Sequence, residues 1–249
     1  MVKLSKAHTK FIKSLQLKKY RQAEQAFVVE GEKSVLEVIA SDFEVNEVIC
    51  SSSFYENHAE RLAGIQRWEA DDLSPLGSFR SNNQALAVVN MKKNQAFAYT
   101  GGMVLALDDV NDPGNFGTIL RIADWFGITG ILASPNTCEL YNPKVISASK
   151  GSFTRIPVYF DDLDRSVKKL NIPVLAADMD GENVHNLQFP KDVCLVLGNE
   201  AHGISPGLGK LISRRITIPS FGNAESLNVG MAAAIIIDNY RRSVSQPAP

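Results

Sequence analysis

The chain has 249 residues, of which 45% are hydrophobic, and its formal net charge is −1. This length suits one large domain or two small ones with packed cores. No apolar run approaches the roughly 20 residues of a membrane span, and the N-terminus lacks the apolar core of a signal peptide, so we expect a cytoplasmic protein. Cys50, Cys138 and Cys194 lie far apart and match neither a metal site nor a disulfide framework, which predicts buried, reduced thiols.

Positive charge is concentrated at the N-terminus. Residues 1–21 carry six lysines, one arginine and no acidic residue. Basic segments gain affinity for nucleic acids by displacing counterions from phosphates. A solvated helix face has the same composition, so the charge alone leaves both interpretations open. Apolar residues recur between the lysines at helical intervals, which predicts a basic amphipathic helical segment over residues 4–22.

Short strands alternate with helices in the rest of the first 95 residues, which predicts a small α/β sandwich. The strands are expected at residues 27–29, 45–50, 65–69 and 84–89. The helices are expected from Gly31 to Ile39, and at residues 55–62 and 72–77. Residues 91–100 break the periodicity, and we assign the linker to residues 96–101.

The strongest pattern runs from residue 105 to 131, LALDDVNDPGNFGTILRIADWFGITGI. Residues 104–107 predict a buried strand, residues 111–115 a polar turn, and the apolar spacing after them a helix. Residues 128–132 predict the next strand. Ligands collect at the carboxyl ends of parallel strands, which makes this turn a candidate site. Arg121 lies six residues beyond Asn115, so both can face one pocket.

The remaining sequence alternates more strongly. Strands are expected at residues 156–160, 174–178, 193–197 and 216–219, and helices at 142–149, 161–170, 208–212 and 226–240. The last helix is almost wholly apolar, and such a helix is buried inside a domain or in a subunit interface. Residues 243–249 are expected to be disordered.

Several common sites lack support. The chain has no G-x-G-x-x-G, no G-x-S-x-G and no histidine pair at metal spacing, and residues 203–210 fail the phosphate-loop pattern by one position. Asp108 and Asp109, at the end of a strand, could hold Mg²⁺ for phosphoryl transfer, but nothing else of that machinery is present. His202 lies in a turn and suits a local hydrogen bond better than catalysis. We therefore expect no metal site.

Two later stretches also end in polar turns: residues 193–205, VCLVLGNEAHGIS, and residues 216–240, ITIPSFGNAESLNVGMAAAIIIDNY. With the central stretch they give three blocks: N-x-x-x-x-x-R with D-P-G-N, then L-G-N-E-x-x-G, then I-P followed by E-S-L-N-V. In this order, over roughly residues 102–242, the blocks resemble the motifs of the SpoU (TrmH) family of RNA ribose 2′-O-methyltransferases. The N-terminal part is more loosely similar to the family's ribosomal-protein-like substrate-binding domain.

The resemblance implies an α/β protein of two domains. A small RNA-binding α/β domain would occupy residues 1–95, and the catalytic domain residues 102–249. The catalytic domain would be a SPOUT α/β knot, whose mostly parallel sheet threads into a deep trefoil knot. The resemblance also implies a homodimer with the cofactor site near the interface.

The implied cofactor is S-adenosylmethionine. Its methyl sulfonium is already activated, so the protein has to orient an oxygen nucleophile and help to remove its proton. Backbone groups of loops and an apolar floor for the adenine would come from Leu197, Gly198, Ile218, Pro219 and Leu227. Gly198 would let the backbone come close.

The implied catalytic residues are Asn115, Arg121, Glu200, Ser226 and Asn228. Arg121 matches the residue proposed to activate the ribose hydroxyl. The pKa of arginine exceeds about 12, so it could act as a base, or through its charge by lowering the pKa of the hydroxyl or holding a phosphate. Asn115 would orient Arg121 or the ribose, and Glu200 would fix the arginine or its loop. Ser226 and Asn228 would position RNA or the cofactor carboxylate at a helix N-terminus, although Ser226 could be a plain N-cap.

The implied substrate is structured RNA, and the added N-terminal domain favours ribosomal over transfer RNA. Its expected RNA contacts are Lys10, Lys13, Lys18, Lys19 and Arg21. A second hypothesis is a non-catalytic RNA-binding protein that retains the fold, but the intact site residues favour an enzyme. The chain departs from the family at residues 147–151, which begin with serine where arginine is common, so one RNA contact is absent or moved to Lys150 or Arg155.

Overall fold

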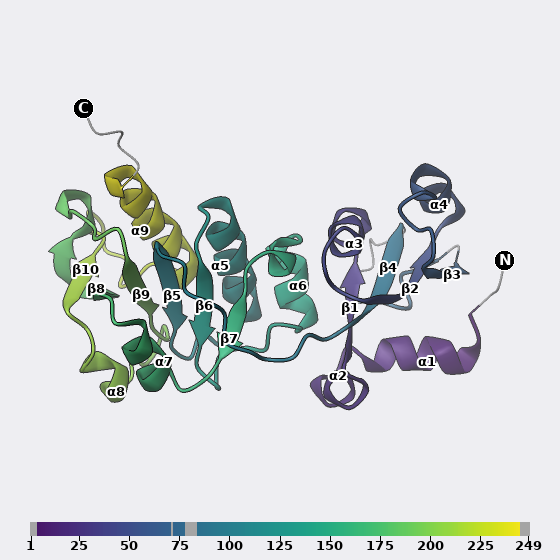
Figure 1. The fold of residues 1–249 in the computed structure, drawn as a ribbon, viewed down its shortest axis with the longest axis horizontal. Helices are drawn as coiled ribbons and strands as arrows, with labels where there is room; N and C mark the ends of the chain where they lie inside the picture. Colours follow the sequence, from purple (N-terminus) through teal and green to yellow (C-terminus); the bar gives the residue numbers. More distant parts are fainter. Residues whose placement is uncertain (1–3, 71, 78–83, 245–249) are drawn as a thin grey trace. The chain divides into compact units, whose positions relative to one another are not determined.

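The computed structural model describes residues 4–70, 72–77 and 84–244, which form two compact units that alternate along the chain (Figure 1). The first unit comprises Met1–Lys93 and Leu140–Arg155, and the second comprises Asn94–Glu139 and Ile156–Pro249. Residues 140–155 therefore pack into the first unit, although the sequence suggested that they belong to the catalytic domain. Of the tail expected to be disordered, Ser243 and Val244 belong to the last helix, and residues 245–249 lie outside the described residues.

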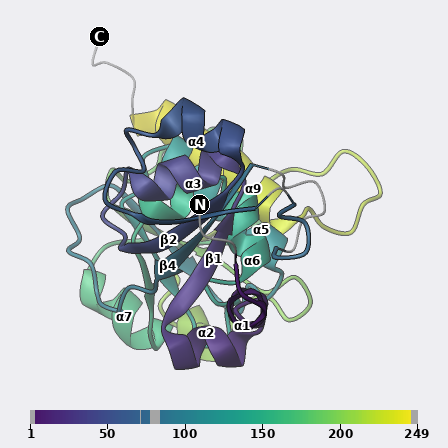
Figure 2. The same cartoon turned by 90° about the vertical axis from the view of Figure 1, so that its right-hand side faces the viewer.

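A four-stranded sheet in the order β1-β4-β2-β3 forms the centre of the first unit. Its strands are β1 (Ala26–Glu30), β2 (Val45–Cys50), β3 (Gln66–Glu69) and β4 (Ala85–Asn90). β4 runs antiparallel to β1 and β2, and β3 runs parallel to β2. Figure 2 shows α1 (Lys6–Ser14) and α2 (Lys18–Glu24) on one side of this sheet and α3 (Glu32–Ile39) and α4 (Ser52–His58) on the other.

The basic amphipathic helical segment expected at residues 4–22 forms two short helices, α1 and α2. One local prediction in this unit is wrong. The helix expected at residues 72–77 is a turn, because the Asp72 carboxylate accepts hydrogen bonds from the backbone N–H and the hydroxyl of Ser74. Such a local bond competes with the first turn of a helix.

The core of the first unit has contributions from both stretches of the chain. Ile12 and Leu15 of α1 pack with Val28, Ile49 and other strand residues on one face of the sheet. On the other face, the ring of Phe27 lies 4.5 Å from that of Tyr141 and 5.9 Å from that of Phe153, measured between centroids. Tyr141 lies just before α6 (Pro143–Ser149), and Phe153 is the middle residue of the 3₁₀ helix η1 (Ser152–Thr154). Residues 140–155 are thus part of this core.

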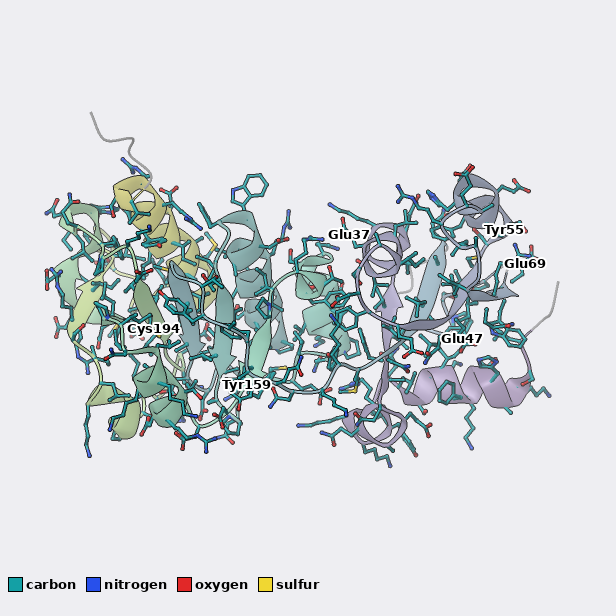
Figure 3. The ribbon with its side chains drawn as sticks, in the orientation of Figure 1. Glu37, Glu47, Tyr55, Glu69, Tyr159 and Cys194 are labelled. Carbon is teal, nitrogen blue, oxygen red and sulfur yellow. The ribbon has the colours of Figure 1, made fainter. Side chains whose placement is uncertain are left out.

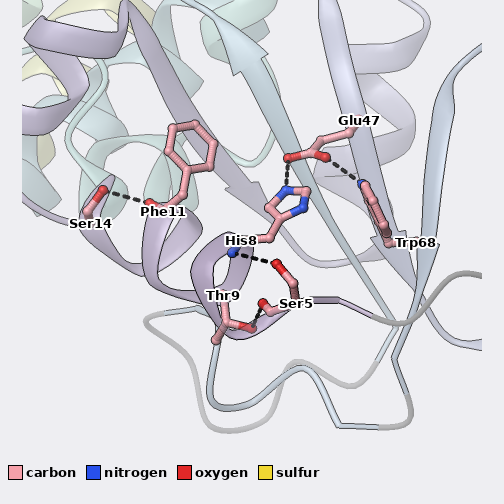
Figure 4. A network of polar contacts seen from close by, with 7 residues as sticks. All are labelled: Ser5, His8, Thr9, Phe11, Ser14, Glu47 and Trp68. Carbon is pink, nitrogen blue, oxygen red and sulfur yellow. Dashed lines mark hydrogen bonds and ion pairs between the residues drawn. The ribbon is translucent and has the colours of Figure 1, made fainter.

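A polar network ties α1 to the sheet (Figure 4). His8 Nε2 lies 2.7 Å from Glu47 Oε1, and Trp68 Nε1 donates to Glu47 Oε2 at 2.5 Å. Glu47 is only 8% exposed, so its carboxylate needs these partners to offset the cost of burial. The Ser5 hydroxyl, which accepts from the backbone N–H of His8, caps the start of α1.

The second unit contains a six-stranded sheet in the order β10-β8-β9-β5-β6-β7, and every pair in it is parallel. Its strands are β5 (Met103–Leu107), β6 (Gly130–Ala133), β7 (Val158–Phe160), β8 (Val174–Asn183), β9 (Val193–Leu197) and β10 (Arg214–Thr217). Its helices are α5 (Pro113–Trp125), α7 (Leu163–Leu170), η2 (Val184–Asn186), α8 (Pro206–Gly209) and α9 (Val229–Val244). The expected α/β architecture with a parallel sheet is confirmed, and the trefoil knot stays a prediction.

Helices cover both faces of this sheet, which explains its nearly continuous apolar strands. α7 and α8 pack on the face that carries Val104, Ala106 and Cys194. α5 and α9 pack against each other and bury Phe116, Ile119, Ile236 and Tyr240, among others.

The three cysteines differ in their surroundings. Cys194 lies inside the sheet of the second unit (Figure 3), and burial raises the pKa of its thiol to about 12. Burial also raises the pKa of Cys50. Cys138 is only half-buried, so the expectation of three buried thiols is wrong for this residue.

No helix within the described ranges is both long and apolar enough to cross a membrane.

Candidate active site

Three turns meet at the carboxyl edge of the parallel sheet. They follow β5, β9 and β10, and β5 is the direct neighbour of β9. From β5 the chain continues outward through β6 to β7, whereas β8 and β10 lie on the other side of β9. The chain connections thus run in opposite directions on the two sides of the neighbouring strands β5 and β9. Such a reversal opens a crevice at the strand ends, where α/β proteins bind ligands.

The first turn leads into α5. Asp112 is the N-cap, and its side chain accepts from the backbone N–H of Asn115 at 2.8 Å. Pro113 occupies the first turn, where its missing N–H costs nothing. This cap fixes the position of Asn115 at the start of the helix.

Asp108 and Asp109 hold the loops in place. Asp108 Oδ2 accepts from the backbone N–H of Ser205 at 2.6 Å, while Asp109 Oδ1 accepts from the Ser134 hydroxyl at 2.6 Å. The two carboxylates therefore serve different partners and do not converge on a Mg²⁺ site. In the described part of the chain, no three His, Cys, Asp or Glu residues are grouped as a metal would require.

The second turn closes on itself behind β9. Asn199 and Gly203 exchange two backbone hydrogen bonds of 2.9 Å. The Asn199 side chain accepts from the backbone N–H groups of Ala201 and His202, so His202 takes part in the turn through its backbone. A Cβ at Gly198 would lie 2.7 Å from the backbone of Gly203. Gly198 is thus required by the turn itself, and the close approach of a ligand to its backbone stays a prediction.

The third turn ends at α9, which begins at Val229 and not at Ser226. Asn228 caps it, because its Oδ1 accepts from the backbone N–H groups of Gly230 at 3.0 Å and Met231 at 3.3 Å. Ser226 is exposed and is not the N-cap, which corrects that alternative.

Hydrogen bonds join one residue from each turn. Asn115 Nδ2 donates to Glu200 Oε1 at 2.8 Å, and Asn228 Nδ2 donates to Asn115 Oδ1 at 2.8 Å. Glu200 Oε1 also lies 3.4 Å from the backbone nitrogen of Val229, at the start of α9. A carboxylate is favoured there by the helix dipole and its unpaired N–H groups. These hydrogen bonds connect the three turns directly to one another.

A pocket of about 680 Å³ lies beside this network. It is lined by all five residues expected to hold the cofactor, Leu197, Gly198, Ile218, Pro219 and Leu227, and also by Glu200 and Ser226. Its volume falls within the range of small-molecule sites, roughly 300–1,000 Å³.

Arg121 lies apart from the network. It is exposed on α5, and no hydrogen bond or ion pair to it is present among the described residues. Glu200 therefore fixes Asn115 and α9 and leaves the arginine free. Asn115 and Asn228 border the pocket without lining it, and Arg121 is not among the lining residues.

The sequence missed part of the pocket wall. Ala177, Asp178 and Met179 of β8 line it, as do Phe221 and Ile236. β8 extends to Asn183, whereas the apolar pattern ended at residue 178. The polar run D-M-D-G-E-N has no alternation that would mark it as a strand, so the sequence contained no signal for this wall.

A basic surface lies on the first unit. Lys10 and Lys13 on α1 and Lys18 and Lys19 on α2 are exposed. Arg21 is different: it is 2% exposed, and its guanidinium donates to the carbonyls of Leu15 at 2.9 Å and Gln16 at 2.8 Å. Arg21 therefore stabilises the end of α1, and the expectation that it contacts RNA is not supported.

Comparison with known families gives two matches. Residues 102–238 match the SpoU rRNA Methylase family, and residues 6–74 match the MRM3-like substrate binding domain.

Similar proteins cover nearly the whole chain. A 23S rRNA guanosine 2′-O-methyltransferase of Bacillus subtilis, RlmP, is 30% identical over 92% of this chain and 94% of its own. A structure of an RNA methyltransferase of the TrmH family from Porphyromonas gingivalis is 32% identical, with a TM-score of 0.83 over 97% of this chain and 99% of its own. An AdoMet-bound rRNA methyltransferase from Sinorhizobium meliloti is 25% identical, with a TM-score of 0.86 over 98% of this chain and 97% of its own.

Proposed function

Because the chain belongs to the SpoU rRNA Methylase family, we propose that it transfers a methyl group from S-adenosylmethionine to a ribose 2′-oxygen of structured ribosomal RNA. The observation that carries the proposal is the network of Asn115, Glu200 and Asn228 at the rim of the pocket. It joins the three family motifs at one place, as a shared reaction centre requires.

The pocket has the properties that S-adenosylmethionine needs. No backbone-to-backbone hydrogen bond involves residues 219–226, all of which are described. Apart from Pro219, which has no N–H, and the carbonyl of Gly222, which accepts from the Ser220 hydroxyl at 3.2 Å, their backbone groups are available to a ligand. Leu197, Ile218 and Leu227 supply apolar surface next to these groups. When bound, the cofactor supplies an electrophilic methyl group. The side chains that border the pocket would orient the ribose hydroxyl in line with this methyl group.

Arg121 would act on the ribose hydroxyl through its positive charge. The guanidinium is exposed and unpaired among the described residues, so it can meet an incoming ribose or phosphate. A cation beside the hydroxyl lowers its pKa, so that its proton can pass to solvent water, and stabilises the negative charge on the oxygen, which would take the methyl group as S-adenosylhomocysteine leaves. A role as general base is the alternative. Asn115 and Glu200 are positioning residues, since they hold the turns together.

The basic surface of α1 and α2 would bind the RNA. Lys10 and Lys13 lie on one helix, and Lys18 and Lys19 on the next, where the ammonium of Lys19 lies 4.7 Å from the ring centroid of the exposed Tyr20. Cations next to an exposed aromatic ring suit both phosphates and unstacked bases. The match of residues 6–74 to a substrate-binding domain supports this assignment, and transfer RNA is the alternative substrate.

A homodimer is supported by exposed apolar residues on α5 and α9. Trp125 is 85% exposed and Met231 is 57% exposed, and their helices pack against each other. Exposed Trp and Met residues are typical of subunit interfaces. Light scattering after gel filtration should give twice the 27.3 kDa of one chain, and Trp125→Glu should give the monomer mass. A ribosomal substrate also supports the cytoplasm as the compartment.

Calorimetry with S-adenosylmethionine and S-adenosylhomocysteine tests the proposed function first. Micromolar binding, with methyl transfer to ribosomal RNA and none to transfer RNA, is the expected result. Mapping methylated riboses in cells that lack the protein would then identify the nucleotide. No binding by the folded protein at millimolar cofactor, with and without RNA, would favour the non-catalytic RNA-binding protein.

A further inference from the structure

The pocket wall formed by β8 contains a wide bulge. β8 and β10 pair at Ala176 with Arg215, and their next pair is Glu182 with Ile216. Five residues of β8, 177–181, are therefore left out of the backbone pairing with β10. A bulge of this kind redirects side chains and is common next to active sites.

Several contacts hold the bulge in place. The Thr217 hydroxyl donates to the carbonyl of Met179 at 2.9 Å, and Arg215 forms an ion pair with Asp178. Asp178 Oδ1 accepts from the backbone N–H of Met179 at 2.7 Å. A Cβ at Gly181 would lie 2.6 Å from the backbone of Arg215, so glycine is required there. These contacts fix the backbone of Met179, and yet the residue is 72% exposed.

A second exposed apolar residue lines the same pocket from another segment. Phe221 lies in the loop between β10 and α9 and is 97% exposed. Neither Met179 nor Phe221 contributes to a core: Met179 lines the pocket from β8, and Phe221 lines it from the loop that follows β10. The reaction centre must lie at the other side, where Glu200 joins Asn115 and the start of α9.

We infer that Met179 and Phe221 clamp the adenine of the cofactor from two sides. The inference rests on the proposed function. If the sulfonium faces the network, the adenine is the flat aromatic group of the cofactor that lies next to Met179 and Phe221. Aromatic rings stack on adenine, and methionine sulfur makes favourable contacts with aromatic rings. Met179 lies outside the three blocks and Phe221 between the two parts of the third, and together they determine how tightly the adenine is held.

Calorimetry on Met179→Ala, Phe221→Ala and the double variant tests the clamp. The ligands are S-adenosylmethionine and 5′-methylthioadenosine, which keeps the adenine and lacks the amino-acid part. We expect each single change to weaken both ligands about fivefold, and the double change about 25-fold. Phe221→Trp should keep the affinity, and Leu17→Ala, an exposed apolar residue of the first unit, should not alter it. Both clamp residues are exposed, so the melting temperature should stay unchanged.

Two results would overturn the clamp. Unchanged affinity for 5′-methylthioadenosine in the double variant means that the residues do not touch the adenine. An unchanged cofactor Kd with a raised KM for RNA means that they face the substrate. Failure of the proposed function is seen separately, because the wild-type protein would then bind neither ligand.

Discussion

Asn115 Nδ2 donates to Glu200 Oε1 over 2.8 Å, which joins the turn after β5 to the turn after β9. The other end of the same amide accepts from Asn228. An amide, with a donor on one end and an acceptor on the other, satisfies both neighbours at once. A carboxylate cannot do so.

We therefore expect Asn115→Asp to lower kcat about 10- to 100-fold, since a hydrogen bond to a charged group contributes about 1.5–3 kcal/mol. The new carboxylate would face Glu200 and separate the turns. Steady-state kinetics on ribosomal RNA, together with the cofactor Kd, measure the effect. A variant with wild-type kcat would remove Asn115 from the positioning network.

Arg121→Ala should keep the fold and cofactor binding but lower kcat about 10²- to 10³-fold, the usual cost of losing an electrostatic group at a reaction centre. Arg121→Lys should retain part of the activity, because it keeps the charge. Lys191→Ala, which removes another exposed cation, is the matched control. Unchanged turnover in Arg121→Ala would exclude the arginine from the mechanism.

Gly198→Ala should open the second turn. The added methyl group would lie 2.7 Å from the backbone of Gly203, and overpacking of this kind costs about 1–3 kcal/mol. Thermal unfolding should show the loss of stability, and calorimetry a loss of cofactor affinity. Gly209→Ala is the control, because nothing lies within 4 Å of the new methyl group. Equal stability of the two variants would contradict this account of Gly198.

Tyr99 should make stability depend on alkaline pH. Its hydroxyl donates to Gly102 O and Asp192 Oδ1, and burial, followed by the bond to Asp192, raises its pKa to about 12. Between pH 10 and 12 the unfolded chain loses this proton while the folded chain keeps it, so the free energy of unfolding falls as the pH rises. Tyr99→Phe should reduce that fall in urea titrations, and Tyr20→Phe should not. If the free energy of unfolding fell equally with pH in Tyr99→Phe and in the wild-type protein, the alkaline loss of stability would not be due to Tyr99.

Arg21→Ala should destabilise the first unit by about 1–3 kcal/mol, because two carbonyls at the end of α1 lose a charged donor. Lys13→Ala, on the exposed face of α1, should leave the stability within about 0.5 kcal/mol and weaken RNA binding. Denaturant unfolding and filter binding separate the two effects. A loss of stability in Lys13→Ala and not in Arg21→Ala would contradict the structural role given to Arg21 and the RNA-binding role given to Lys13.

The second unit could be predicted well because its signals are local. Apolar runs marked β5 and β9, and apolar spacing marked the body of α5, which begins at Pro113, inside the turn predicted at residues 111–115. The N-terminus of α9 was misplaced because Ser226 and Asn228 are both good caps, and only the neighbouring Asn115 and Glu200 select Asn228. Local propensity cannot express a choice made by residues as distant in the chain as Asn115, which lies 113 positions before Asn228.

The bulge of β8 and the burial of Arg21 were missed for the same reason. Both depend on partners that are set by the fold: Arg215 and Thr217 for the bulge, and the end of α1 for Arg21. A basic residue in a basic segment looks identical to its neighbours in the sequence.

The placement of residues 140–155 has a consequence for dissecting the protein. Phe27 and Phe43 belong to the first stretch of the first unit, and the rings that cover them, Tyr141 and Phe153, are made only after β5 and β6. A fragment that ends at residue 93 would leave this aromatic cluster open to water. The first unit is thus not a separable module, and a ribosome has to translate well into the second unit before the core of the first can close.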